Sequence, residues 1–504
     1  MSLSKQRGQP TLKQSVGTLP GQQESRGRWG FPARLGFVVA CLGALVLCAA
    51  VFILAFGGAV LNGYVKKRAE RAFAEAHPGW ALRIGKLHYA VGANRLVAQS
   101  LTLSATNTTL KAGRISLTGV PWARLLRGRV ALADVLAKAS LDATNLDVDF
   151  PQARYGIRCA RLRGSVPDSD LIAEGTELRT LVGDEEFFAA HEYRTTRFRL
   201  VLPECRVTGL AYGELLRGRS YRAGSVRISE PSFDALVDRD KPEEPFVKSP
   251  LMVHEALAAI RQPLRIDSLS ITNGHLRYCE RVLDGADPGV LTFGSVSMSV
   301  EGIANRPEGN AAIQVRAQGD LMDTGTLKVL MTIPVTPSDF SLHYSGSLSA
   351  MDLTRLDAFL DIAEHTRIKS GSAQEASFDI DVNAGQARGR VQAVYRDLEI
   401  ALLNKRTGSA KGLENRAASF LANELKIRHS NSPDLDKQTG GAAGLENRVT
   451  SFFADALKIR RSNAPDASGS MKEGEVNFTR RPEDEFLQFV WFALRSGVLD
   501  VISH

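Results

Sequence analysis

The feature that most constrains the fold is a repeated alternation of apolar and polar residues with a period of two. In SFDIDVN, Phe378, Ile380 and Val382 alternate with aspartate and asparagine side chains. Because successive side chains of a strand point to opposite faces, each such segment is predicted to be a strand with one dry face and one wet face. The same pattern gives three further sets of apolar positions: Leu146, Val148 and Phe150; Leu327 and Val329; and Leu398 and Ile400.

Turn signals separate these alternating runs. Pairs such as Asn273-Gly274 and Ala384-Gly385 recur at hairpin-like intervals, which predicts a long antiparallel sheet. Helical patterns are few: one runs from Asp352 to Glu364, two lie near the C-terminus, and one closes the chain. So few helices could not cover both faces of such a sheet. The chain is therefore predicted to be mainly β, with a sheet that folds into a sandwich or barrel or curls around something else.

A run of 27 residues without a charge, Leu35 to Leu61, precedes this β-rich body. At a rise of ~1.5 Å per residue it can cross a bilayer core of ~30 Å, so we predict one transmembrane helix over 35–62. The rival is a cleaved signal peptide, whose apolar region is only about 7 to 15 residues long. Residues 1–34, rich in Gly, Gln, Ser and Arg, are predicted to be a disordered cytoplasmic tail. Residues 63–78 are predicted to form a helix that continues outward.

The residue types that carry chemistry form no recognisable site. The net charge of +8 is small for 504 residues and the basic residues are mixed with acidic ones, so nucleic acid is a poor candidate partner. No nucleophile elbow, phosphate-binding loop or zinc-binding helix motif occurs. Cys159, Cys205 and Cys279 are predicted to be buried thiols, with one disulfide among them as the alternative. We therefore predict a non-enzymatic protein with no cofactor and no metal.

Two internal repeats organise the body. TGVPWARLLRGR, from Thr118 to Arg129, recurs as TGLAYGELLRGR, from Thr208 to Arg219, and is predicted to be a helical turn that joins strands. A longer unit, from Gly412 to Asp434, recurs from Gly444 to Asp466 with 16 of 23 positions identical, and each copy predicts an amphipathic helix leading into a short strand. The predicted parts are an N-terminal β part (79–240), a charged linker and helix (241–262), a C-terminal β part (263–410), the duplicated helix-strand segment (411–470), and a terminal strand and hydrophobic helix (471–504).

The closing segment EFLQFVWFALRSGVLDVI is apolar around most of a helix, with Phe486, Phe489, Trp491 and Phe492 as its aromatic residues. Burial of such side chains contributes ~1.5 to 3 kcal/mol each, so the helix is not expected to stay in water. Two interpretations follow. The helix covers the sheet as a hydrophobic lid, or it docks on a membrane or on a partner there.

Three parts of the chain resemble the AsmA-like proteins of Gram-negative envelopes. They are IGKLHY…RLVAQSLTLS from Ile84 to Ser104, the TG…LLRGR joints that precede strands, and GEVNFTRRPEDEFLQFVWFALRSGVLDVI from Gly474 to Ile502. The resemblance implies a single-pass inner-membrane anchor with a cytoplasmic N-terminus. It also implies an elongated periplasmic antiparallel sheet that curls into an open groove, as in bridge-like lipid carriers.

The function implied by this resemblance is transport of phospholipid, or of another acyl-chain lipid, between inner and outer membranes, or maintenance of envelope integrity. The candidates for the groove floor are then the alternating apolar residues Leu146, Val148, Phe150, Leu327, Val329, Phe378, Ile380, Val382, Leu398 and Ile400. In that role, Ile380→Asp should block lipid occupancy and leave the body folded. An outer-membrane or envelope protein is a possible partner.

Two other functions stay open at this point. In the first, the protein is an assembly factor that pairs outer-membrane strands with an edge of its sheet. In the second, it is an envelope enzyme whose site no sequence motif reveals. Bound lipid would favour the groove, and crosslinks from the sheet edge to a nascent outer-membrane protein would favour the assembly factor.

Overall fold

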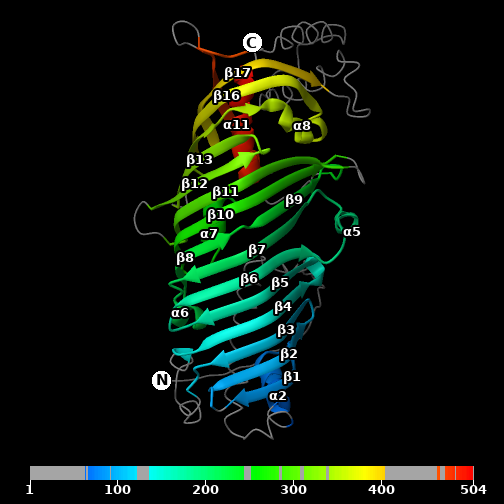
Figure 1. Ribbon diagram of the computed structural model, residues 1–504, viewed down its shortest axis with the longest axis vertical. Helices are drawn as coiled ribbons and strands as arrows, with labels where there is room; N and C mark the ends of the chain where they lie inside the picture. The colour runs from blue at the N-terminus through cyan, green and yellow to red at the C-terminus, as the bar shows by residue number, and fades with distance from the viewer. Residues whose placement is uncertain are drawn as a thin grey trace, which may run out of the picture. The chain divides into compact units, whose positions relative to one another are not determined.

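The computed structural model describes residues 63, 66–90, 92–121, 136–242, 251–282, 287–306, 311–335, 340–402, 462–465, 471–482 and 484–502. All of them belong to one compact unit, Val46–His504. Eighteen described strands form a single sheet (Figure 1). They are β1 Ala81–Ala90, β2 Arg95–Ala105, β3 Thr108–Thr118, β4 Ser140–Phe150, β5 Tyr155–Ser165, β6 Asp170–Thr180, β7 Thr196–Thr208, β8 Tyr221–Ser229, β9 Ser232–Asp238, β10 Leu264–Arg281, β11 Gly289–Ala304, β12 Ala312–Leu321, β13 Gly325–Pro334, β14 Leu342–Leu348, β15 Met351–Asp352, β16 Thr366–Asn383, β17 Gln386–Leu402 and β18 Glu473–Thr479.

The predicted mainly β fold is confirmed, and the described strands form one sheet instead of two facing sheets. Neighbouring strands pair antiparallel from β1 to β7 and again from β10 to β14, and β16, β17 and β18 continue the order. The strands β1 and β18 pair only with β2 and β17 among the described ladders. Figure 1 shows the strands stacked in this order.

The prediction of a purely antiparallel sheet is wrong at one junction, because β10 runs parallel to both β8 and β9. Strands β8 and β9 are short, are separated by Glu230 and Pro231, and both pair with β7. After β9 the chain passes through the short helix α7 (Val253–Ala258) before it enters β10. This connection returns the chain to the starting end of β8, so β10 must run in the same direction as β8 and β9.

In several strands the buried face is occupied by even-numbered residues in one half of the strand and by odd-numbered residues in the other half. The backbone of Ser100, Asn145 and Gly175 is left-handed, with φ of 53°, 52° and 58°. In β2 the residues buried on one side of Ser100 include Leu96 and Ala98, and those on the other side include Leu101 and Leu103. A local irregularity of this kind redirects the side chains that follow it, so apolar residues on both sides of it share one face.

The described helices are short except for the first and the last. They are α2 Lys66–Ala76, α5 Asp184–Ala189, α6 Tyr212–Leu216, α7 Val253–Ala258, α8 Asp357–Ala363 and α11 Phe486–Ile502, together with the 3₁₀ turns η2 Pro151–Ala153 and η3 Leu353–Leu356. The outward helix predicted over 63–78 is present as α2, and the second TG…LLRGR copy forms the helical turn α6 between β7 and β8. The predicted closing helix is confirmed as α11.

Several predictions fall on residues that the structure does not describe. They are the tail over 1–34, the membrane helix over 35–62, most of the first TG…LLRGR copy, and nearly all of the duplicated segment over 411–470. Within the described ranges, no helix combines the length and the apolar character needed to cross a bilayer.

Candidate functional site

Helix α11 identifies one face of the sheet, which we call the inner face. The Tyr344 hydroxyl on β14 donates a hydrogen bond to the carbonyl of Val490 over 3.1 Å, and burial raises the pKa of this tyrosine. Phe489 is fully buried, with its ring centroid 5.2 Å from that of Phe340 and 5.8 Å from that of Phe478. The helix therefore packs on β14, β17 and β18 through their inner side chains.

Glycine allows α11 to approach the sheet closely. A Cβ atom on Gly474 of β18 would lie 2.0 Å from the carbonyl oxygen of Gly497. A Cβ atom on Gly497 would lie 2.6 Å from the Cγ2 atoms of both Val391 and Val476. Both distances are too short for a side chain, so this helix–sheet contact requires glycine on each partner.

A line of apolar residues crosses the inner face from strand to strand, and we call it the apolar row. Each member lies directly opposite the next in the pairing register, so all of them share one face of the sheet. The row consists of Tyr89, Leu96, Leu117, Leu141, Gly164, Leu171, Val207, Val226, Leu269, Val300, Val315, Met331, Tyr344, Ile380, Gly389 and Val476.

The exposure of the apolar row changes along its length. Leu96 and Leu117 are almost fully buried near the first strands, and Tyr344, Ile380 and Val476 are almost fully buried beneath α11. Between these ends lie seven successive members that are only partly buried. They are Leu171, Val207, Val226, Leu269, Val300, Val315 and Met331. We call these seven residues the half-exposed segment.

A second line of apolar residues runs across the other end of the strands in the same way. It consists of Leu82, Leu103, Leu110, Val148, Ile157, Leu178, Leu200, Phe233, Leu276, Phe293 and Leu321. Its first four members are buried, and the members from Ile157 to Leu321 are partly buried. The apolar side chains of the middle strands are therefore partly exposed at both ends of these strands.

The structure does not bring the predicted floor residues to one place. Leu146, Val148 and Phe150 are buried in β4. The other seven belong to the core around α11, in which Phe378, Ile380, Val382 and Leu398 are buried, and Leu327, Val329 and Ile400 pack against them while partly exposed. Sequence reasoning missed the half-exposed segment, because serine, threonine and charged residues flank its valines and make the alternation less apparent.

The four aromatic residues named for the closing helix have different surroundings. Phe489 is buried, Phe486 and Phe492 are partly buried, and Trp491 is 48% exposed. The Phe492 ring lies 5.9 Å from that of Phe478. In this structure α11 thus covers the sheet as a lid, and its outward side also carries exposed Leu487 and Val498.

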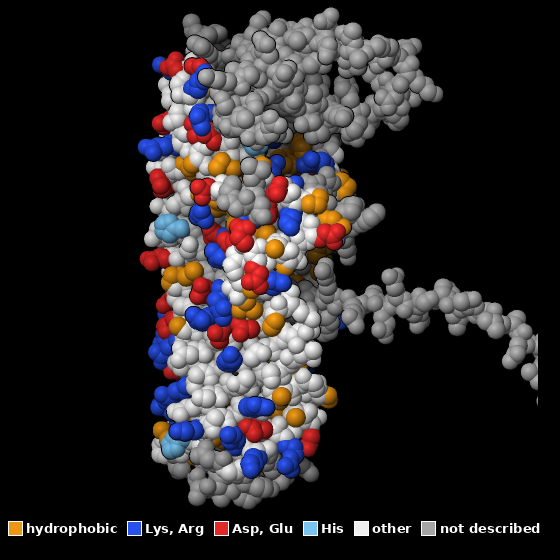
Figure 2. Space-filling model, turned by 90° about the vertical axis from the view of Figure 1, so that its right-hand side faces the viewer, with side chains coloured by type: hydrophobic (Ala, Val, Ile, Leu, Met, Phe, Trp, Pro, Cys, Tyr) orange, Lys and Arg blue, Asp and Glu red, His pale blue; other side chains and the backbone are white. Residues whose placement is uncertain are grey.

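The outer face carries cross-strand charge pairs. Arg161 donates hydrogen bonds to both carboxylate oxygens of Asp142, over 3.1 and 2.7 Å, and these bonds lower the pKa of the carboxyl group. Basic and acidic side chains are also interspersed on the side of the molecule that faces the viewer in Figure 2, which is the right-hand side of Figure 1. This mixture is typical of a face that stays in water.

Ion pairs also connect α5 to β7 and β10. Arg197 is 2% exposed and pairs with Asp184 of α5 and with Asp234 of β9. Burial of the Arg197 guanidinium lowers its pKa. Phe187 and Phe188 pack against Leu236 and Cys279 in a small core. The described cysteines Cys159, Cys205 and Cys279 are free thiols.

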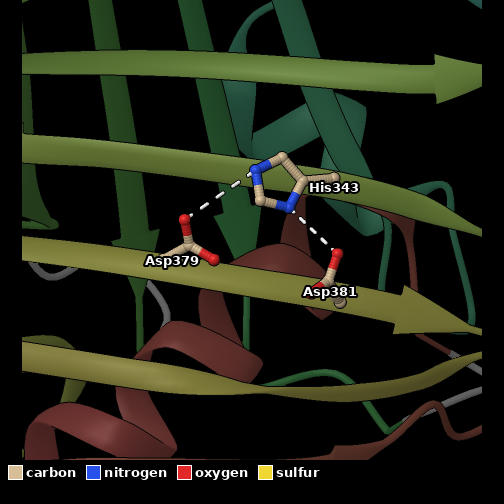
Figure 3. A group of neighbouring side chains, drawn as sticks. All are labelled: His343, Asp379 and Asp381. Carbon is tan, nitrogen blue, oxygen red and sulfur yellow. Dashed lines mark hydrogen bonds and ion pairs between the residues drawn. The ribbon is translucent and has the colours of Figure 1, made fainter.

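One group of side chains on the outer face has atoms that could coordinate a metal ion. His343 Nδ1 lies 3.0 Å from an oxygen of Asp381, and His343 Nε2 lies 3.9 Å from an oxygen of Asp379 (Figure 3). The two carboxylates are 66% and 70% exposed. In the register, Arg388 and Arg390 lie opposite Asp381 and Asp379, so the group is one section of a solvated charge ladder. We assign no metal to it.

The comparisons with known proteins identify no family. No protein-family model matches the chain, and no curated protein matches it. The resemblance to AsmA-like proteins therefore stays a prediction from sequence motifs.

Proposed function

We propose that the protein is a non-enzymatic groove protein that binds the acyl chains of lipids on the inner face of its sheet. The half-exposed segment carries this proposal. It is a continuous line of seven apolar side chains, in register across seven strands, that are all partly exposed. Val300, Val315 and Met331 pack against the core around α11, and the other four members, Leu171, Val207, Val226 and Leu269, lie outside that core. A contiguous apolar surface of this kind is costly in water, and it marks a place where an apolar partner binds.

The length of the half-exposed segment fits a lipid tail. Strands in a sheet are ~4.8 Å apart, so seven of them extend over roughly 29 Å. A bilayer core of ~30 Å contains two opposed tails, which gives about 15 Å for each tail. One acyl chain, or two end to end, can therefore lie along the segment. Binding is passive, because the apolar face replaces the bilayer around the tail while the head group stays in water.

The cellular role that we propose follows the sequence resemblance. An uncharged run over Leu35–Leu61 anchors the chain in the bacterial inner membrane, the body lies in the periplasm, and lipid moves along the groove toward the outer membrane. The support for this role is the apolar run and the three motifs that resemble AsmA-like proteins.

Two valines of the same strand test the proposal. Val207 belongs to the half-exposed segment, whereas Val201 of the same strand β7 points to the outer face and is 42% exposed. Val207→Asp should reduce the lipid that co-purifies with the full chain severalfold, because a carboxylate beside a lipid tail is poorly solvated. Val201→Asp should leave it unchanged. Lipid is measured by mass spectrometry of detergent-exchanged protein, and equal lipid in parent and Val207→Asp would refute the groove.

The sheet edges do not favour the alternative role as an assembly factor. At the β1 edge the amide of Ile84 donates to a carboxylate oxygen of Glu70 on α2 over 2.7 Å. At the β18 edge the amide of Glu475 donates to Asp500 of α11 over 2.9 Å. Side chains of this chain thus already occupy backbone donors that an added strand would need.

A further inference from the structure

An open depression lies between α2 and the first two strands. It is open to solvent, offers about 460 Å³ of space, and is lined by Lys66, Lys67 and Glu70 of α2, by Arg83, Ile84 and Gly85 of β1, and by Ser100 of β2. Gly85 keeps the floor low, because a Cβ atom there would lie 2.8 Å from the Cβ atom of Ser100.

The charges around the depression are unbalanced. Its three cations face one carboxylate, Glu70, which accepts the amide hydrogen bond of Ile84. Lys66 donates from Nζ to the carbonyl of Gly85 over 3.1 Å, which fastens α2 to β1. Among the described residues, Lys67 and Arg83 have no ion pair. Two positive charges therefore remain available to a ligand.

The type of ligand follows from these donors. Lysine and arginine side chains are the residues that bind phosphate groups, arginine with two parallel hydrogen bonds. The 27-residue uncharged run ends five positions before Lys66, so the depression follows closely on the segment that we propose as the membrane anchor.

We infer that the depression binds the phosphate of a phospholipid head group. This inference rests on the proposed function, since it names the lipid class that enters the groove. The ligand is an anionic phospholipid, and Lys67 and Arg83 are the residues that contact its phosphate.

Calorimetric titration of the full chain in non-ionic detergent tests the inference, with dihexanoyl phosphatidylglycerol, dihexanoyl phosphatidylcholine and inorganic phosphate as probes. The variant is Lys67→Glu combined with Arg83→Glu. The matched control is Lys111→Glu combined with Arg114→Glu, which reverses two exposed charges on β3 outside the depression. The parent should bind phosphatidylglycerol more tightly than phosphatidylcholine. The variant should bind phosphatidylglycerol at least tenfold more weakly, and the control less than twofold more weakly.

Three results would overturn the inference. They are no binding by the parent, an equal loss in variant and control, and inorganic phosphate bound as tightly as the lipid, which would make the site one for free phosphate. A milder variant, Lys67→Gln with Arg83→Gln, keeps the test valid if charge reversal impairs folding. Lipid co-purified with the same preparations separates the two proposals. If the parent carries no lipid but the variant loses phosphatidylglycerol binding, the groove fails and the head-group site stands.

Discussion

The inner face at β14–β18 and the same face at β6–β13 are built from similar residues but differ in burial. At β14–β18, Tyr344 and Ile380 are 1% and 0% exposed, because α11 lies on the sheet there. At β6–β13, members of the same apolar row such as Val207 and Val226 remain partly exposed. The comparison shows that the element which covers a strand, rather than the alternation within it, decides whether an apolar position becomes core or surface.

The largest expected effect is that of a charge placed in the covered region. Ile380→Asp should lower the free energy of unfolding by about 3 to 5 kcal/mol, because the carboxylate has no partner in a site closed by α11. This differs from the sequence-based expectation of a folded variant that merely lacks lipid. Thermal denaturation measures the loss. Asp381→Asn, on the exposed side of the same strand, should change the stability by less than about 0.5 kcal/mol. A near-native melting temperature for Ile380→Asp would show that α11 does not close this region.

A second prediction removes the cover itself. Gly497→Val should cost about 1 to 3 kcal/mol, because its side chain would overlap Val391 and Val476 and push α11 away from β17 and β18. Amide hydrogen exchange should then accelerate in α11 and in β18. Val498→Ala, at a 37% exposed position of the same helix, is the control and should leave exchange unchanged. Unchanged protection in Gly497→Val would contradict the close contact described between helix and sheet.

A third prediction places a charge in the half-exposed region. Val226→Asp should cost about 1 kcal/mol, because the carboxylate can reach water from a partly exposed site and little packing is lost. The difference between the stability losses of Val226→Asp and Ile380→Asp measures how much better the inner face is covered at β14–β18 than at β6–β13. Both variants are compared with the parent by chemical denaturation. If the two losses are equal, the middle strands are as well covered as the end, and the proposal of a groove loses its basis.

The sequence predicts the strands well because alternation depends on local geometry alone. The segments around Val148 and Ile380 are strands, as predicted. The segment that begins at Phe486 is a helix, also as predicted. The parallel entry of β10 depends on how the chain returns after β9, which no local pattern records. The change of phase at Ser100 and Asn145 could have been read from the sequence, because apolar positions on either side of each residue are out of step.

The candidate site was harder to predict than the fold. Burial of Phe378 and Ile380 depends on α11, which lies about 110 positions further along the chain, and the sequence does not say which strands this helix covers. The segment with the clearest alternation, around Phe378 and Ile380, was therefore predicted to be groove floor, although it belongs to the core beneath α11. The half-exposed segment follows only from the pairing register, which places Val207, Val226 and Leu269 in one line.

The smallest expected effect comes from the outer face, where the two regions do not differ. Arg161→Ala removes the hydrogen bonds that depress the pKa of Asp142. A carboxyl group with a depressed folded-state pKa stabilises the protein at pH values above its unfolded-state pKa, and this contribution disappears as the pH falls through the folded-state pKa.

At pH 7 the parent should therefore be only slightly more stable than Arg161→Ala, because solvent screens this pair, whose side chains are 43% and 40% exposed. The difference should shrink toward zero as the pH falls below the folded-state pKa of Asp142. Melting temperatures of both proteins across this range measure it, with Lys111→Ala as a control for the loss of one surface charge. If Arg161→Ala loses as much stability as Val226→Asp, outer-face ion pairs also contribute to the difference in stability between the two regions. If the stability loss is small and disappears at low pH, the difference between the two regions arises from the inner face and from its coverage by α11.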